Sequence, residues 1–239
     1  IPHDPARGLE MVERLRAGRF DAAIVFTSFR QSPLPAAYLC YLAGIPLRLA
    51  ASTDAPGSLL TTRHRHEEAL VDEVERGLGL VGAIGIPPAD RRLVLDLPDS
   101  ACRHASRLRM ELTGSPERDR NRPLAVVHPG CSMPARTYPA DRYTRVIESL
   151  VAELDATVAL TGVASERDLT AGIAHGLGPE ARERTHDLAG HLPFPDFCAL
   201  IGAADLVVTN NTGPMHVAAA TNTPVIALFA LTNPPEQWG

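Results

Sequence analysis

Short apolar runs that favour β-strands alternate with helix-like segments along almost the whole of this 239-residue chain. A strand that is followed by a helix and then by another strand is typical of a parallel sheet covered by helices. The runs expected to form strands are 21–26, 47–50, 93–95, 124–128, 157–161, 186–188, 206–209 and 224–229. The alternation therefore predicts an α/β fold with parallel sheets.

The helix-like segments between these runs have one apolar side. In the clearest of them, Tyr143, Ile147, Leu150 and Leu154 recur at the three- and four-residue spacing that places side chains on one face of a helix. Further helices are expected at 67–81 and 98–112.

The segment 113–123 consists almost entirely of polar residues, glycine and proline, so it is the best candidate for a linker. We therefore expect an N-terminal domain at 1–115 and a C-terminal domain at 116–239. The second has the strand and helix pattern of a whole Rossmann-like unit. The first has fewer strands than such a unit needs and begins with Ile1 rather than methionine, so we expect an incomplete domain and a piece of a longer protein.

Charge and cysteine content exclude some classes of function. A formal net charge of −5 argues against a nucleic-acid partner, because binding to phosphate backbones needs clustered excess cation. All 23 basic residues are arginine, so any side chain that pairs with a phosphate as a permanent cation must be an arginine. The four cysteines have no metal-ligand spacing, and no signal peptide or membrane-length apolar run is present, so a cytoplasmic protein is expected.

Two loops at the carboxyl ends of expected strands carry groups that suit an anion. In the loop 129–138, Gly130 permits close backbone approach, Ser132 offers a hydroxyl and Arg136 offers a planar fork of donors. Either loop alone is explained equally well by turn formation, with glycine turning the chain and Arg136 in solvent.

The loop 210–216 leads into a helix that we expect to begin at 212–214, because Thr212 is a good N-cap and Pro214 suits the first turn. The free N–H groups and the dipole of such a helix attract anions. Because the carboxyl ends of parallel strands share one edge of a sheet, both loops would face a single anion. The groups offered to it are Ser132, Arg136, Thr212, the N–H groups of Gly213 and Met215, and His216.

Several segments match a known family. One reads Asn210-Asn-Thr-Gly-Pro-Met-His-Val-Ala-Ala-Ala220 and is followed by Thr223-Pro-Val-Ile-Ala-Leu-Phe229, while His128-Pro-Gly130 precedes an arginine seven residues after Pro129. With these segments the chain resembles the heptosyltransferase family, glycosyltransferase family 9. Supporting similarity at 20–26, 32–37 and 42–48 extends it over nearly the whole chain.

The resemblance implies a GT-B fold of two Rossmann-like domains, the C-terminal one binding an ADP-heptose-type donor and the N-terminal one the acceptor. Thr212, Gly213 and His216 match the family's phosphate-contacting positions, and Arg136 matches a basic position that is usually lysine. Glu166 corresponds to a glutamate near the nucleotide ribose. The turn that ends at Gly190 resembles one that passes near the nucleobase.

Two positions depart from the family pattern. Asn211 stands where aspartate is common, so a carboxylate near the diphosphate is replaced by a neutral amide. The first strand of the family and its glycine-aspartate loop, which supply the proposed catalytic base, should lie upstream of Ile1. We therefore expect this chain to lack the base.

The implied function is inverting transfer of a sugar, heptose from ADP-heptose, to a lipopolysaccharide-core or related glycan acceptor. Arg136 and Thr212 would stabilise the leaving diphosphate, no metal or other cofactor would be needed, and the acceptor would bring the protein into peripheral contact with a membrane. One alternative is another GT-B enzyme, such as a nucleotide-sugar epimerase. The other is a non-catalytic module that binds a nucleotide sugar.

Weaker candidates lie elsewhere. His64 and His66 lack a third metal ligand nearby, so a solvated loop is expected there. His128 is expected to be a packed, hydrogen-bonded side chain. The segment 28–33 is a candidate contact for the acceptor substrate.

Overall fold

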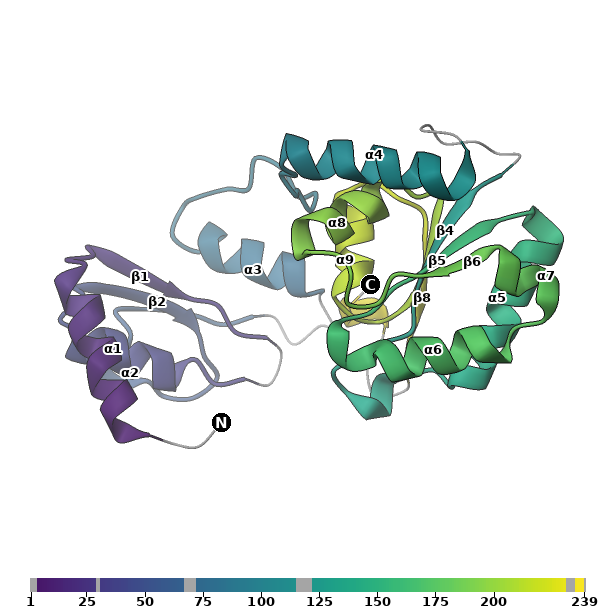
Figure 1. The fold of residues 1–239 in the computed structure, drawn as a ribbon. Helices are drawn as coiled ribbons and strands as arrows, with labels where there is room; N and C mark the ends of the chain where they lie inside the picture. The colour runs from purple at the N-terminus through teal and green to yellow at the C-terminus, as the bar shows by residue number, and fades with distance from the viewer. Residues whose placement is uncertain (1–3, 29–30, 67–71, 115–121, 231–234, 239) are drawn as a thin grey trace. The chain divides into compact units, whose positions relative to one another are not determined.

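The computed structural model describes residues 4–28, 31–66, 72–114, 122–230 and 235–238, and divides into two compact units, Ile1–Arg91 and Arg92–Gly239 (Figure 1). The first unit contains a parallel three-stranded sheet in the order β1-β2-β3. Its elements are α1 (Pro5–Ala17), β1 (Ala22–Val25), α2 (Leu34–Leu42), β2 (Leu47–Ala51), η1 (Gly57–Leu59), β3 (Thr62–His64) and α3 (Glu73–Gly82).

The second unit contains a parallel five-stranded sheet in the order β6-β5-β4-β7-β8. Its strands are β4 (Leu124–His128), β5 (Thr157–Leu160), β6 (Thr185–Asp187), β7 (Leu206–Asn210) and β8 (Val225–Leu228). Its helices are α4 (Asp99–Thr113), η2 (Pro134–Arg136), α5 (Ala140–Leu154), η3 (Ala164–Glu166), α6 (Arg167–Gly176), α7 (Pro179–Glu183), α8 (Phe194–Ala203), α9 (Gly213–Ala220) and α10 (Pro235–Trp238). The strand order reverses between β4 and β7, which is where open sheets of this kind bind ligands.

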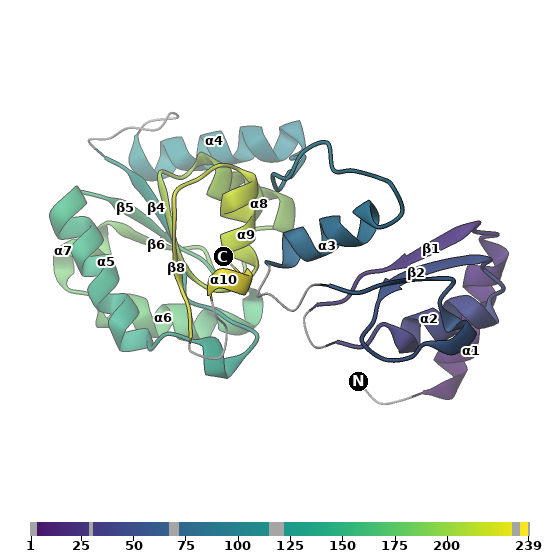
Figure 2. The ribbon, with the colours of Figure 1, turned by 180° about the vertical axis from the view of Figure 1, so that it is seen from behind.

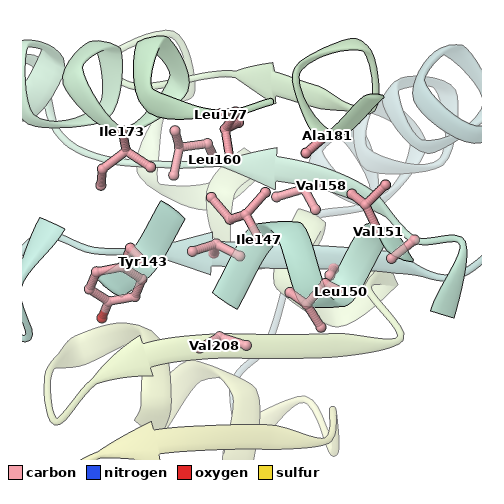
Figure 3. Packing of buried hydrophobic residues seen from close by; sticks show 13 residues of the cluster. Tyr143, Ile147, Leu150, Val151, Val158, Leu160, Ile173, Leu177, Ala181 and Val208 are labelled. Atoms are coloured by element: carbon pink, nitrogen blue, oxygen red, sulfur yellow. The ribbon is translucent and has the colours of Figure 1, made fainter. Parts of the chain in front are cut away.

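Helices cover both faces of this sheet, as Figures 1 and 2 show from opposite sides. On one face, α5, α6 and α7 pack on side chains such as Val127, Val158 and Val208. Figure 3 labels the last two of these. On the other face, α8 and α9 pack on Val126, Ala159 and Val207. Successive residues of a central strand thus face the apolar cores on opposite sides of the sheet. This explains why residues that are adjacent in the sequence, such as Val126 and Val127, are both apolar.

The apolar side predicted for the helix in α5 is confirmed for its first three turns. Tyr143, Ile147 and Leu150 are buried against the sheet (Figure 3). Leu154 is the exception, because it is the last residue of the helix and 49% of its surface is exposed.

Two other predictions about the elements need correction. The apolar run 93–95 is not a strand, and Val94 is 77% exposed because no neighbouring strand pairs with it. The strand β3 was not predicted, since Thr62, Arg63 and His64 have no apolar pattern and their pairing with β2 is what makes them a strand. Among the described residues, the structure contains no helix long and apolar enough to cross a membrane.

Helix α4 belongs to the second unit, whereas the predicted boundary between 115 and 116 falls after it. Arg109 of this helix is 1% exposed and donates to the carbonyl oxygen of Ala203 at 2.7 Å and to Asp205 Oδ2 at 2.8 Å. The same Asp205 oxygen accepts the N–H of Leu124 at 2.7 Å. A buried ion pair therefore joins α4 to the starts of β4 and β7, so the units divide ahead of this helix.

Candidate functional site

The two predicted anion-binding loops lie side by side at the carboxyl edge of the second sheet. β4 and β7 are neighbours, with His128 paired in register with Thr209. Asn210 is fully buried between the loops, where its Nδ2 donates to the carbonyl oxygen of Pro129 at 2.8 Å and its Oδ1 accepts the N–H of Tyr138 at 3.0 Å. This clamp was not predicted, because a strand-terminal asparagine is equally common in ordinary turns.

Helix α9 begins at Gly213, within the predicted range, and Thr212 occupies the N-cap. Thr212 makes no side-chain cap bond, however, and its hydroxyl donates to the carbonyl oxygen of Asn210 at 3.4 Å. Met215 is buried and its N–H donates to the carbonyl oxygen of Thr212 at 3.1 Å, so this predicted donor is already satisfied. Gly213 is exposed, and within the described chain its N–H has no acceptor, which leaves it available to an anion.

Arg136 lies in η2 on the other loop and is partly exposed. Its guanidinium makes no hydrogen bond or ion pair with any residue that the structure describes. The nearby Ser132 hydroxyl is exposed, and His216 lies in the first turn of α9. The second unit therefore brings an unpaired guanidinium, two hydroxyls and an open helix N-terminus to one edge of its sheet.

Asn211 presents an unusual polar group beside this helix. Its N–H donates to the carbonyl oxygen of Leu228 at 3.0 Å, while its side chain is 4% exposed and its Nδ2 has no partner in the parts of the chain that are described. A buried donor without an acceptor is costly, so such groups in native proteins often face a ligand or water.

Glu166 lies directly over the backbone of Gly130. A Cβ atom on Gly130 would overlap the Glu166 carboxylate, so only glycine leaves room for this side chain. Glu166 Oε2 accepts the N–H of Val163 at 2.8 Å, which holds the carboxylate in place. Glu166, the predicted ribose contact, thus directly contacts Gly130 of the predicted phosphate loop 129–138.

His128 is packed and hydrogen-bonded, as predicted. Its Nδ1 lies 3.1 Å from the hydroxyl of Thr161, and its ring packs on Phe197 with 5.4 Å between centroids. Burial lowers the pKa of His128, and the Glu166 carboxylate, 3.9 Å from Nε2, offsets this only in part.

Stability should fall as the pH falls below about 6.5, the ordinary pKa of histidine. Burial lowers the pKa of His66, His128, His186 and His216, so the unfolded chain binds more protons than the folded chain below that pH. Urea unfolding between pH 8 and 5 measures the effect. A free energy of unfolding that is equal or higher at pH 5.5 than at pH 7.5 would contradict it.

Gly190 has a φ of +69°, and a Cβ atom there would lie 2.7 Å from Arg167 Nε and 2.9 Å from the Cα of Ala164. The N–H of Gly190 donates to the carbonyl oxygen of Gly162 at 2.8 Å. The predicted nucleobase turn therefore packs on the segment that carries Glu166, and the positive φ explains its glycine.

In the first unit, Ser28 and Gln31 of the predicted acceptor segment line a hollow of about 240 Å³ together with His66 and Arg76. Residues 29–30 of that segment lie outside the described residues. The rings of His64 and His66 contact edge to face at 4.8 Å. The described residues contain no group of three side chains that could hold a metal ion.

Known proteins resemble this chain in sequence and in fold. The family model described as glycosyltransferase family 9 (heptosyltransferase) matches residues 9–238. Lipopolysaccharide heptosyltransferase 2 of Escherichia coli K12 is 29% identical over 92% of this chain and 62% of its own length. Lipooligosaccharide heptosyltransferase 2 of Haemophilus influenzae is 38% identical over 47% of this chain and 33% of its own length.

Two solved structures share the fold. The E. coli ADP-heptose lps heptosyltransferase II has a TM-score of 0.74 and 26% identity, covering 99% of this chain and 70% of that chain. The glycosyltransferase family 9 protein of Veillonella parvula has a TM-score of 0.79 at 16% identity, covering 100% of this chain and 66% of that chain. The predicted α/β fold of GT-B type is thereby confirmed. The chain spans between 33% and 66% of the length of the first curated relatives it matches.

Proposed function

The chain belongs to glycosyltransferase family 9, the heptosyltransferase family, and on that premise we propose that its second unit binds the nucleotide-sugar donor of a heptosyl transfer. The donor is ADP-heptose and the acceptor is a lipopolysaccharide-core or related glycan. The observation that carries the proposal is the meeting of Arg136, Thr212 and the open N-terminus of α9 at one sheet edge.

In the proposed reaction the bond between the anomeric carbon and the donor diphosphate breaks while the acceptor hydroxyl bonds to the opposite face of that carbon, with inversion. The acceptor proton goes to a base, and ADP leaves with the bonding electron pair. Three groups stabilise the negative charge that develops on the diphosphate: the guanidinium of Arg136, the hydroxyl of Thr212 and the N–H of Gly213. These groups supply cationic and hydrogen-bond stabilisation, so we propose that no metal ion is required.

The test is binding followed by transfer. The full-length enzyme is titrated with ADP and ADP-heptose by calorimetry, and ADP release is then followed with a lipopolysaccharide acceptor that lacks the added heptose. We expect ADP to bind on its own. We also expect ADP-heptose to yield free ADP only when the acceptor is present. Binding of ADP-heptose without transfer would instead support a nucleotide-sugar-binding module, and failure to bind ADP would reject the donor assignment.

Gly130→Ala should weaken ADP binding by about tenfold or more, because the new Cβ displaces the Glu166 carboxylate. The proposed hydrogen bond between this carboxylate and the nucleotide ribose is worth about 1.5–3 kcal/mol. Calorimetric titration with ADP measures the change. Gly172→Ala in α6 is the matched control, since its Cβ meets no atom within 4 Å. Equal ADP affinity of wild type and Gly130→Ala would show that Glu166 does not contact the nucleotide.

A further inference from the structure

Residues 92–96 connect the two units and are weakly held. They lie in the stretch between α3 and α4, in which the structure has no helix or strand. Leu93, Val94, Leu95 and Asp96 make no hydrogen bond with any residue that the structure describes, and Val94 is 77% exposed. A backbone with no hydrogen bonds and few buried side chains can change its dihedral angles at little cost.

The chain ahead of this stretch belongs to the first unit. Helix α3 packs there through Leu80, which is 2% exposed, and a Cβ atom on Gly77 would lie 3.9 Å from the ring of Phe26, just after β1. The guanidinium of Arg91 forms an ion pair with Glu75 of the same helix. The division between the units falls directly after Arg91. The chain is thus tied to the first unit up to that residue.

The chain behind this stretch is fixed to the second unit from Leu97 onward. An apolar cluster joins α4 to α8 and contains Leu97, Ala101, Ala105, Ala199 and Ala203. His104 Nδ1 lies 2.9 Å from Asp196 Oδ2 of α8. Nearer the other end of α4, Arg109 pairs with Asp205 at 2.8 Å. Contacts along most of its length therefore make α4 a rigid part of the second unit.

The linker predicted at 113–123 is not a joint between the units. Asp205 Oδ2 accepts from Arg109 at 2.8 Å and from the N–H of Leu124 at 2.7 Å. One carboxylate oxygen thus ties the chain on both sides of that segment. Bending within 113–123 leaves both of its ends in the second unit, so it cannot move one unit relative to the other.

We propose that residues 92–96 form the hinge about which the two units move relative to each other, and that α4 moves with the second unit. Pro88 and Pro98 restrict the backbone on either side, which concentrates rotation in the residues between them. The inference goes beyond the proposed function, because it does not depend on which ligand the protein binds.

The experiment measures distances between pairs of spin labels in the full-length enzyme by double electron–electron resonance. Cys102 is an exposed thiol on α4 and takes one label, while Cys131→Ser removes the other accessible thiol of the described chain. The second label is placed at Glu10→Cys in α1 or at Arg145→Cys in α5, both exposed positions. We expect a narrow distance distribution for the pair within the second unit and a broader one for the pair with α1, because only the latter spans 92–96.

Two insertions locate the hinge. Insertion of a glycine pair after Val94 should broaden the distribution between the units further, because it lengthens and loosens the hinge. The same insertion after Gly114 is the matched control and should leave both distributions unchanged, because Asp205 holds the chain on both sides of that segment.

Equal widths for the two label pairs would overturn the inference, and so would a broad distribution within the second unit. Broadening by the insertion after Gly114 but not by the one after Val94 would place the hinge at 113–123 instead. These measurements need no bound nucleotide, so the hinge can fail while the proposed function stands, and the reverse.

Discussion

In the full-length enzyme, Arg136→Ala should lower the turnover of sugar transfer by about 10²–10³-fold, the cost of removing one group that stabilises charge developing in a transition state. Arg136 lies in the loop that Asn210 clamps beside α9. Its guanidinium has no protein partner within the described residues, so its charge is available to the ligand. The helix N-terminus contributes only a partial charge of about +0.5, which cannot replace a full cation.

Turnover is measured as ADP release at saturating donor and acceptor, with ADP affinity measured separately. Arg136→Lys keeps the charge but replaces a planar fork with a single ammonium, so it should retain more activity than the alanine variant. Arg145→Ala, on the exposed side of α5, is the matched control and should behave as wild type. Unchanged turnover in Arg136→Ala would reject the assignment of this loop to the leaving group.

Arg109→Ala should lower the free energy of unfolding by about 3–5 kcal/mol, because it leaves a largely buried carboxylate without its cation. Arg109 is 1% exposed and bonds both to Asp205 and to the carbonyl oxygen of Ala203. Asp205 also accepts the N–H of Leu124, so loss of the arginine disturbs the starts of two central strands together.

Urea unfolding monitored by circular dichroism measures this effect. Arg107→Ala, two residues earlier on the exposed side of the same helix, should change the free energy by no more than about 0.5 kcal/mol. Arg109→Met should lose less than the alanine variant, since it refills the space with apolar surface. If Arg109→Ala unfolds at the same urea concentration as Arg107→Ala, α4 is not held to the second unit by this ion pair.

The three central strands of the second sheet, β4, β5 and β7, could be predicted because each is buried on both faces and therefore begins as a continuous apolar run, as in Leu124–His128. The same reasoning failed for 93–95, which is equally apolar but pairs with no strand among the described residues. It also missed Thr62–His64, which is polar and forms a strand because it pairs with β2. The boundary ahead of α4 could not be predicted, because local composition marks 113–123 as a linker but does not show the long-range bond between Arg109 and Asp205.

For the site, the sequence by itself determined which groups are offered: the arginine, the hydroxyls and a helix that begins at Gly213. These follow from residue type and from preferences that act over a few residues. Only the tertiary structure decided how they meet. Asn210 joins the two loops, Glu166 lies over Gly130, and Nε2 of His128 lies 3.9 Å from the Glu166 carboxylate. Each of these relations depends on which strands become neighbours, and neighbours in a parallel sheet are set by packing of the whole unit rather than by adjacent residues.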